Sequence, residues 1–298
     1  MAERVAMLFP GQGSQSPGMG KPYLNTPEFS IANKAGEILG IDFEKLICEE
    51  SDSALKSTHD SQLAILVTSL MSFESWKKKT QENPICFAGH SLGQVTALIC
   101  AGTISFEEGI VFASERAKET QKCADSHGGS MAALLGADTK SASQLCDSFP
   151  ELWIANDNAP GQIVIAGNNE SINKAVENAR DFAIKKAVLL PVNGAFHTPY
   201  MNDAAQALES VLSNMTFNDP VSGVASNDDG RAYTKGNVWK EKLSIHVARP
   251  VKWRDCMDAV ALLEPEKAYE VGFGSTLTGL AKRCTPDLTV ESIYGVEN

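Results

Sequence analysis

A serine in a glycine-rich pentapeptide is the sharpest chemical signal in the sequence. Residues 89–93 read Gly-His-Ser-Leu-Gly, a G-x-S-x-G pattern between a predicted strand and a predicted helix. The flanking glycines permit a sharp turn that exposes the Ser91 hydroxyl. The following helix presents free N–H groups and its positive end to an oxyanion formed there. The pattern predicts a nucleophilic serine, and the competing interpretation is a turn in which Ser91 caps the helix.

A nucleophilic serine needs a base, and the sequence has five histidines. His197 lies in residues 193–199, where the chain is expected to return from a small domain to a larger one. A histidine at such a junction is well placed to face a cleft. Taken alone, however, a loop histidine is more often exposed to solvent. His59 and His127 lie in polar stretches and are interpreted as surface residues.

A second glycine loop follows the first apolar segment of the chain. Residues 10–15 read Pro-Gly-Gln-Gly-Ser-Gln, and glycines of this kind let backbone N–H groups approach a ligand closely. No Gly-Lys-Ser/Thr follows, so the loop is not a phosphate-binding P-loop, and it lacks the G-x-G-x-x-G spacing of a dinucleotide site. Taken by itself, this loop identifies no ligand.

The elements that would position these residues alternate between strands and helices. Residues 5–9 and 85–88 are short apolar runs that end in the two glycine loops, as buried strands of a parallel sheet do. Helical periodicity is present over residues 29–39, 61–79, 94–101 and 106–124. This alternation predicts an α/β fold with a parallel sheet covered by helices.

The middle of the chain predicts a second, inserted domain. Its expected order is strand, helix, strand, strand, helix, strand, the ferredoxin-like split βαβ order. The corresponding residues are 131–135, 140–148, 152–155, 162–166, 172–182 and 186–192. We therefore expect an inserted subdomain over 128–193 within a larger domain formed by 1–127 and 194–298. In the larger domain the α/β pattern resumes with a helix over 199–212 and ends near a strand at 270–272.

Composition places the chain among ordinary globular proteins, with 298 residues, 43% hydrophobic, 21% charged and a net charge of −11. An acidic surface repels phosphate backbones, so neither nucleic acid nor an anionic membrane is expected as the main partner. Seven scattered cysteines without a CxxC pair predict reduced intracellular thiols. The apolar run near the N-terminus is too short for a signal peptide, which favours a cytoplasmic location.

Taken together, these motifs closely resemble the malonyl-CoA:acyl carrier protein transacylases of fatty acid and polyketide synthesis. The resemblance follows the family's order along nearly the whole chain. The matching segments are residues 9–15, 89–93, Arg116 with Gln121, 156–162, 195–197, 250–253, 270–272 and 277–280. It implies an α/β-hydrolase-like large domain with a ferredoxin-like insert, in agreement with the order expected from periodicity.

The resemblance also implies a role for each matching residue. Ser91 would attack the thioester of malonyl-CoA, and His197 would accept the serine proton and return it to the leaving thiol. The backbone N–H groups of Leu92 and Gln12 would form the oxyanion hole. The backbone carbonyl of His246 would orient the catalytic histidine. Three further polar residues would contribute to substrate binding: Gln62, Asn156 and Gln162.

Arg116 and Phe196 carry the expected substrate preference. By the resemblance, Arg116 would bind the free malonyl carboxylate bidentately, which a lysine could not reproduce. The competing interpretation is a solvated helix arginine that pairs with Glu115 or Glu119. Phe196 would crowd a substrate that carries an extra α-methyl group. One methyl group discriminates by about 1–3 kcal/mol, so we expect a preference rather than an exclusion.

Three positions depart from the family pattern. Gln94 stands where the family usually has glutamate, which removes a charge near the site. In the segment Gln62-Leu63-Ala64, a leucine replaces the usual proline. His246 stands where the family has glutamine, and a second imidazole near the catalytic one is expected to affect the pH profile.

The expected function is malonyl transfer from malonyl-CoA to acyl carrier protein by a monomer without a metal or bound redox cofactor. Two alternatives stay open: an acyl hydrolase of the same fold, which would gain nothing from Arg116, and a silent scaffold, which intact Ser91 and His197 argue against. Carrier proteins of this system are acidic, as this chain is, so docking needs a local basic patch. The candidates are Lys118, Lys122, Lys185, Lys186, Lys282 and Arg283.

Overall fold

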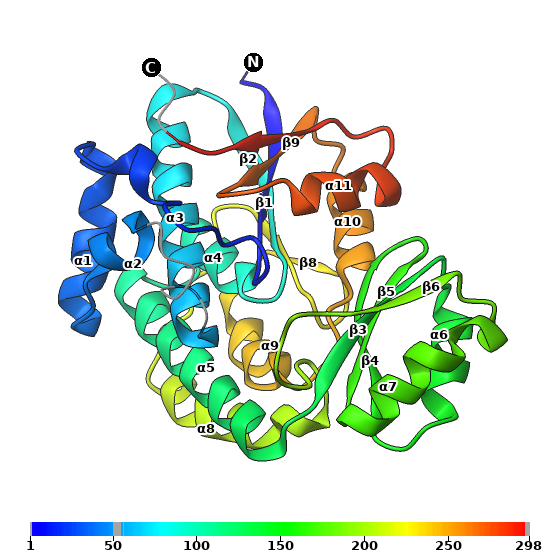
Figure 1. Cartoon of the computed structure of the whole chain (residues 1–298). Helices are drawn as coiled ribbons and strands as arrows, with labels where there is room; N and C mark the ends of the chain where they lie inside the picture. The colour runs from blue at the N-terminus through cyan, green and yellow to red at the C-terminus, as the bar shows by residue number, and fades with distance from the viewer. Residues whose placement is uncertain (1, 50–54, 56, 296–298) are drawn as a thin grey trace.

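Two β-sheets organise the computed structural model, which describes residues 2–49, 55 and 57–295 (Figure 1). Within these residues the larger sheet has the strand order β10-β9-β1-β2-β7-β8, and the smaller one has the order β4-β5-β3-β6. The strands are β1 Arg4–Phe9, β2 Asn83–Gly89, β3 Ser130–Leu135, β4 Leu152–Ala159, β5 Gln162–Gly167, β6 Lys186–Leu189, β7 Gly223–Ala225, β8 Ala232–Tyr233, β9 Lys267–Val271 and β10 Val290–Ile293.

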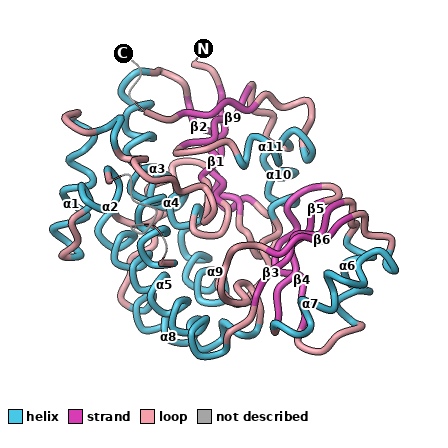
Figure 2. Tube along the Cα trace, in the orientation of Figure 1, coloured by secondary structure: helices cyan, strands magenta, loops and turns pink. Residues whose placement is uncertain are grey.

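Helices surround the larger sheet and cover one side of the smaller sheet (Figure 2). They are α1 Ser30–Leu39, α2 Phe43–Cys48, α3 Thr58–Lys79, α4 Gly93–Cys100, α5 Phe106–His127, α6 Thr139–Asp147, α7 Asn169–Asn178, α8 Asn202–Ser213, α9 Trp239–His246, α10 Trp253–Ala261 and α11 Thr276–Cys284. None of the helices in the described part of the chain has both the length and the apolarity that crossing a membrane requires.

The larger sheet is parallel from β10 to β7, as the alternation of elements predicts, and only β8 runs antiparallel to its neighbour. Its central strand β1 is buried on both faces. Val5, Met7 and Phe9 share a core with α3, α4 and α5, whereas Ala6 and Leu8 share a core with α10 and α11. Burial on both faces explains why this strand is a continuous apolar run rather than an alternating pattern.

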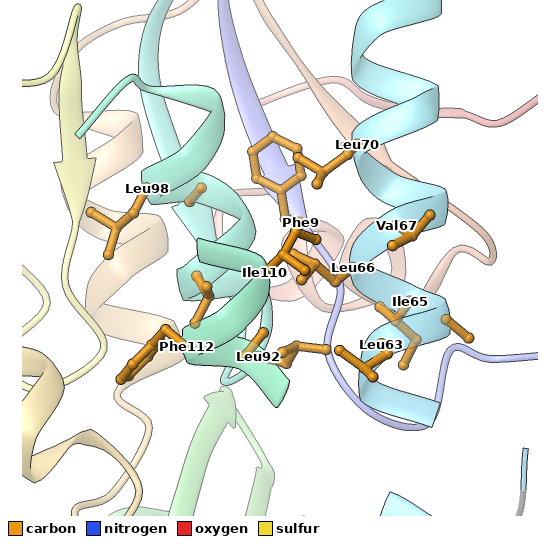
Figure 3. Packing of buried hydrophobic residues seen from close by; sticks show 14 of the residues in the cluster. Phe9, Leu63, Ile65, Leu66, Val67, Leu70, Leu92, Leu98, Ile110 and Phe112 are labelled. Carbon is orange, nitrogen blue, oxygen red and sulfur yellow. The ribbon is translucent and has the colours of Figure 1, made fainter. Parts of the chain in front are cut away.

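Apolar packing also anchors the two glycine loops. Figure 3 shows Phe9, the last residue of β1, among Leu66 and Leu70 of α3 and Ile110 of α5. Leu92, the residue after Ser91, belongs to the same core and is 1% exposed. Burying a leucine or phenylalanine side chain stabilises the fold by about 1.5–3 kcal/mol. The burial of Phe9 and Leu92 therefore holds both glycine loops against the core.

The smaller sheet is antiparallel throughout. Its elements follow one another as β3, α6, β4, β5, α7 and β6, which confirms the expected chain order. The prediction that the last strand reaches Val192 is wrong, because β6 ends at Leu189; Pro191 has no N–H with which to extend the ladder. The predicted helix over 172–182 also ends early, at Asn178, and a 3-10 turn occupies residues 179–182.

β4 joins the smaller sheet to the larger unit. The backbone N–H of Asp157 donates to the carbonyl of Val251 at 2.9 Å, and the N–H of Val251 donates to the carbonyl of Ala155 at 2.9 Å. Beside these bonds, Arg254 Nη2 lies 2.6 Å from Asp157 Oδ2. Alternate residues of the smaller sheet pack on α6 and α7, while the opposite face turns towards Ala195 and the larger unit.

Candidate active site

A tight turn between β2 and α4 presents Ser91, as the glycine pattern predicts. Ser91 has a φ of +52°, in the left-handed region that residues other than glycine rarely adopt. The two glycines of the turn are needed for close approach. A Cβ at Gly89 would lie 1.8 Å from the Gly93 oxygen, and a Cβ at Gly93 would lie 2.1 Å from the Phe9 oxygen. The serine hydroxyl therefore stands at the carboxyl end of β2, just before α4.

His197 lies within hydrogen-bonding distance of this hydroxyl. Ser91 Oγ and His197 Nε2 are 2.7 Å apart, and α4 has no side-chain cap, so the capping interpretation of Ser91 is wrong. His197 is buried rather than exposed. Its Nδ1 lies 3.1 Å from the carbonyl oxygen of His246 and 3.0 Å from that of Arg249. Two carbonyl acceptors place the proton on Nδ1 and leave Nε2 free to accept the serine proton.

Burial keeps this imidazole in its neutral form. The pKa of His197 is lowered from 6.5 to about 3, first by desolvation and then by the positive charge of Arg116, while the hydrogen bonds to the two carbonyls raise it. The ring is therefore unprotonated at neutral pH, which is the state that a general base requires.

Arg116 of α5 points into the same site. It is 3% exposed, its Nη2 donates to Ser91 Oγ at 3.0 Å, and its Nη1 donates to Gln62 Oε1. Burial lowers its pKa to about 10, so it remains a cation at neutral pH. The interpretation of Arg116 as a solvated partner of Glu115 or Glu119 is wrong, because those carboxylates pair with exposed lysines.

A cavity of about 870 Å³ opens in front of the Ser91 hydroxyl, within the size range of small-molecule sites. Met131, Val164 and Leu190 of the smaller unit give it an apolar wall. Most residues of the predicted site line it: Gln12, Gln62, Ser91, Arg116, Asn156, Gln162, Phe196 and His197. Residues from both glycine loops and from the smaller sheet therefore meet at one place.

Leu92 and His246 lie just outside this lining. The Leu92 side chain is in the core, so the residue reaches the site only through its backbone. The His246 ring is buried behind His197, with the two ring centroids 5.7 Å apart. Burial holds the pKa of His246 well below 6.5, and the positive charge of Arg116 lowers it further.

The sequence analysis missed Asn227, which lies beneath the Ser91 turn. Its Oδ1 accepts a hydrogen bond from the backbone N–H of Ser91 at 2.9 Å, and its backbone N–H donates to Gln94 Oε1 at 3.0 Å. Gln94, which stands where the family usually has glutamate, therefore supplies a neutral acceptor to the backbone amide of Asn227. A signal existed, because Ser226 and Asn227 are polar residues directly after β7, whose carboxyl end lies beside that of β2.

Other residues around the cavity are engaged in local contacts. His90 Nε2 lies 2.8 Å from Asn158 Oδ1, and burial lowers the pKa of that histidine. Gln162 accepts a hydrogen bond from Arg283 at 2.6 Å, which places one candidate docking cation beside the cavity lining. Among the described residues, no cluster of three His, Cys, Asp or Glu is arranged to hold a metal ion.

Comparisons with known proteins cover the whole of this architecture. Residues 6–294 match the family described as the acyl transferase domain. The malonyl CoA-acyl carrier protein transacylase of Escherichia coli strain K12 is 34% identical over 298 residues, which cover 97% of this chain and 96% of that protein.

Two solved structures share the fold over nearly their full length. The acyl-carrier-protein S-malonyltransferase of Burkholderia pseudomallei 1710b has a TM-score of 0.93 at 32% identity, covering 98% of this chain and 96% of its own. A malonyl-transacylase in complex with its type II polyketide synthase acyl-carrier protein has a TM-score of 0.93 at 30% identity, covering 99% of this chain and 96% of its own. The similarity therefore spans the segments that form both sheets.

Proposed function

This chain belongs to the acyl transferase domain family, and we propose that it transfers the malonyl group of malonyl-CoA to the pantetheine thiol of acyl carrier protein. One observation carries this proposal: Ser91 Oγ lies 2.7 Å from His197 Nε2 and 3.0 Å from Arg116 Nη2. The site thus combines a nucleophile, a neutral base and a buried cation, the groups needed to transfer a carboxylated acyl chain. The reaction would supply extender units for fatty acid or polyketide synthesis.

In the first half-reaction, Ser91 Oγ attacks the thioester carbonyl while His197 Nε2 takes the hydroxyl proton. The C–S bond then breaks, His197 gives the proton to the CoA sulfur, and the malonyl ester remains on Ser91. The backbone N–H groups of Leu92 and Gln12 hold the oxyanion, and losing one such donor costs roughly 3 kcal/mol. The N–H of Ser91 itself is not available, because it donates to Asn227.

The second half-reaction uses the same groups with a new thiol. The pantetheine sulfur attacks the ester carbonyl, His197 takes the thiol proton, and the proton returns to Ser91 Oγ as the C–O bond breaks. CoA and carrier protein occupy the cavity in turn, which makes the reaction ping-pong. Because the proton and acyl group balance within these steps, we propose that no cofactor or metal takes part and that malonyl-CoA is only a substrate.

Substrate choice rests on Arg116 and Phe196 in this proposal. The guanidinium of Arg116 pairs with the free carboxylate of the malonyl group, and the contact of Gln62 with Nη1 fixes its orientation. Phe196 lines the cavity next to the base and crowds an α-methyl substituent, which gives a preference of about 1–3 kcal/mol. Asn156 and Gln162, on the smaller sheet, contact the rest of the acyl-pantetheine arm.

We also propose an assignment for each unit of the fold. The larger unit, 1–127 and 194–298, is an α/β-hydrolase-like domain, and 128–193 is a ferredoxin-like insert. Support comes from the strand order β4-β5-β3-β6 and from positive φ angles at Gly128, Gly129 and Gly194 at the junctions. We further propose a cytoplasmic monomer, and the net charge of −11 argues against nucleic acid or an anionic membrane as the main partner.

The two alternative functions account for the site less well. A hydrolase of uncharged acyl groups would leave Arg116 as a buried cation without a substrate partner, which is costly. A silent scaffold has no need for the short contact between Ser91 and His197.

Intact-protein mass spectrometry after brief mixing with malonyl-CoA tests the proposal, with acetyl-CoA and methylmalonyl-CoA in parallel. We expect a malonyl adduct that is absent in Ser91→Ala, persists in water and moves to added carrier protein. An adduct with acetyl-CoA alone, or one that water removes within the mixing time, would indicate a hydrolase. Carrier protein binding without any adduct would indicate a scaffold.

A further inference from the structure

Both reacting side chains belong to residues with left-handed backbones. The φ angle is +52° at Ser91 and +60° at His197. A residue other than glycine held in this region costs on the order of 1–3 kcal/mol and persists only where the surrounding structure fixes it. The contacts that fix these two backbones therefore help to set the distance between nucleophile and base.

Asn227 fixes the Ser91 side of the site. Its Oδ1 accepts the Ser91 N–H at 2.9 Å, and its Nδ2 donates to the Gly89 carbonyl at 2.8 Å. One contact needs the oxygen and the other needs the nitrogen, so the orientation of the amide is determined. The residue is 1% exposed, and its backbone is held by Gln94.

The segment from His246 to Arg249 fixes the His197 side. The backbone N–H of His197 donates to the Val247 carbonyl at 3.1 Å, and His197 Nδ1 donates to the carbonyls of His246 and Arg249 at 3.1 and 3.0 Å. Both the backbone and the ring of the base are therefore positioned by one short segment at the end of α9.

The side chain of His246 connects these two sides. Its Nε2 lies 3.2 Å from Asn227 Oδ1, and because an amide oxygen only accepts hydrogen bonds, Nε2 must carry the proton. Its Nδ1 is buried without a hydrogen-bond partner among the described residues. A hydrogen-bonded path thus runs from the Ser91 N–H through Asn227 and His246 to the ring of His197.

We propose that Asn227 and the side chain of His246 are positioning residues that hold Ser91 and His197 at their reacting distance. Neither contacts the substrate. This inference rests on the proposed function and adds to it, because the imidazole at position 246 acts through a hydrogen bond to Asn227 and not as a second base. Glutamine, the usual residue of the family at this position, also carries a side-chain N–H that can reach an acceptor.

Two substitutions at one position test this role. His246→Leu keeps the backbone carbonyl that orients His197 but removes the donor to Asn227, whereas His246→Gln retains a donor. We expect His246→Leu to lower the limiting rate of Ser91 acylation roughly 3- to 10-fold, the equivalent of one hydrogen bond, with an unchanged half-saturating malonyl-CoA concentration. We expect His246→Gln to acylate at the rate of the unsubstituted enzyme. Rapid quenching and mass spectrometry measure these rates.

Three outcomes overturn the inference: an unchanged rate in His246→Leu, a change confined to the half-saturating concentration, or a failure of His246→Gln to restore the rate. Thermal unfolding of both variants detects any loss of folded protein. Such a loss would lower the fraction of Ser91 that is acylated but would leave the rate constant of acylation unchanged.

Nitrogen NMR of the full chain with ¹⁵N-labelled histidine provides a readout that does not depend on catalysis. We expect His246, assigned by its absence from the His246→Gln spectrum, to be the neutral Nε2–H tautomer at neutral pH. An Nδ1–H tautomer would contradict the hydrogen bond to Asn227. If the unsubstituted enzyme formed no malonyl adduct while this tautomer was observed, the proposed function would fail and the structural connection would stand.

Discussion

At Ser91, one oxygen is shared by a base and a cation. His197 Nε2, which carries no proton, accepts from the hydroxyl at 2.7 Å, while Arg116 Nη2 donates to it at 3.0 Å. A donor of this kind stabilises negative charge that develops on the oxygen as the proton leaves. Both partners are buried, and hydrogen bonds in such surroundings are stronger than on a surface.

Arg116→Lys tests the requirement for a guanidinium. A lysine keeps the charge but has no planar fork, so it cannot contact Gln62 Oε1, Ser91 Oγ and a substrate carboxylate in the same geometry. We expect kcat/KM for malonyl-CoA to fall roughly 10- to 100-fold, as for the loss of a charge-assisted hydrogen bond. Lys174→Met, at an exposed lysine of α7 that pairs with Glu170, is the control and should retain full activity. A change of less than about twofold in Arg116→Lys would contradict this role.

At the scale of elements, the carboxyl ends of the parallel strands gather the site. The loop at 10–15 follows β1, Ser91 follows β2, and Asn227 follows β7. At the end of β9, the fully buried Glu270 accepts hydrogen bonds from the backbone N–H groups of Leu277 and Thr278 at 3.0 and 2.7 Å, which attaches α11 to the sheet. Ligand sites form at this edge of α/β sheets because the loops there converge.

Gly93→Ala tests the close approach of α4 to β1. A Cβ at this position would lie 2.1 Å from the Phe9 oxygen, a backbone atom that cannot move without shifting β1. We expect the free energy of unfolding to fall by about 1–3 kcal/mol, or more where the strand does not yield. Denaturant unfolding measures it.

Gly279→Ala is the matched control for that substitution. Gly279 lies within α11 and has no atom within 4 Å of an added Cβ. Alanine there should raise the free energy of unfolding by about 0.5–1 kcal/mol, because glycine is the poorer helix former. Effects of the same sign at both positions would contradict the argument from close approach.

At the scale of the whole molecule, the smaller sheet closes one side of the cavity. β4 is bonded to the segment before α10 through Asp157 and Val251, and Arg254 reinforces that contact. The site shields three histidines from bulk water, and the pKa of each is lowered by desolvation: His90, His197 and His246. A single cavity between two units thus requires several imidazoles to stay neutral.

These histidines predict acid sensitivity of the fold. The pKa values of these histidines in the folded state lie below 6.5. As the pH falls below 6.5, the unfolded chain therefore binds more protons than the folded chain, and the stability that is present at higher pH is lost. We expect the thermal unfolding temperature to fall between about pH 7 and about pH 5. His246→Gln removes one of the three groups and should show a smaller fall. Equal falls in the two proteins would show that His246 does not contribute.

The sequence by itself determined the local chemistry of this protein. The glycines around Ser91 specify a turn through close approach, and the apolar runs beside helical periodicity specify a parallel sheet covered by helices. Resemblance added His197 as the expected partner of Ser91 and Arg116 as the expected cation. These features were predictable because each depends on residues close together in the chain or on motifs with a fixed order.

Only the tertiary structure decided how those groups are held. Asn227 is 136 residues from Ser91 along the chain, and His246 is 49 residues from His197, whose ring contacts its carbonyl oxygen, so no local pattern links them. The structure also decided that Arg116 is buried against Ser91 instead of paired on the helix surface. Hydrogen bonds between distant segments exist only once the core has brought the ends of the strands together, and that packing is a property of the whole chain.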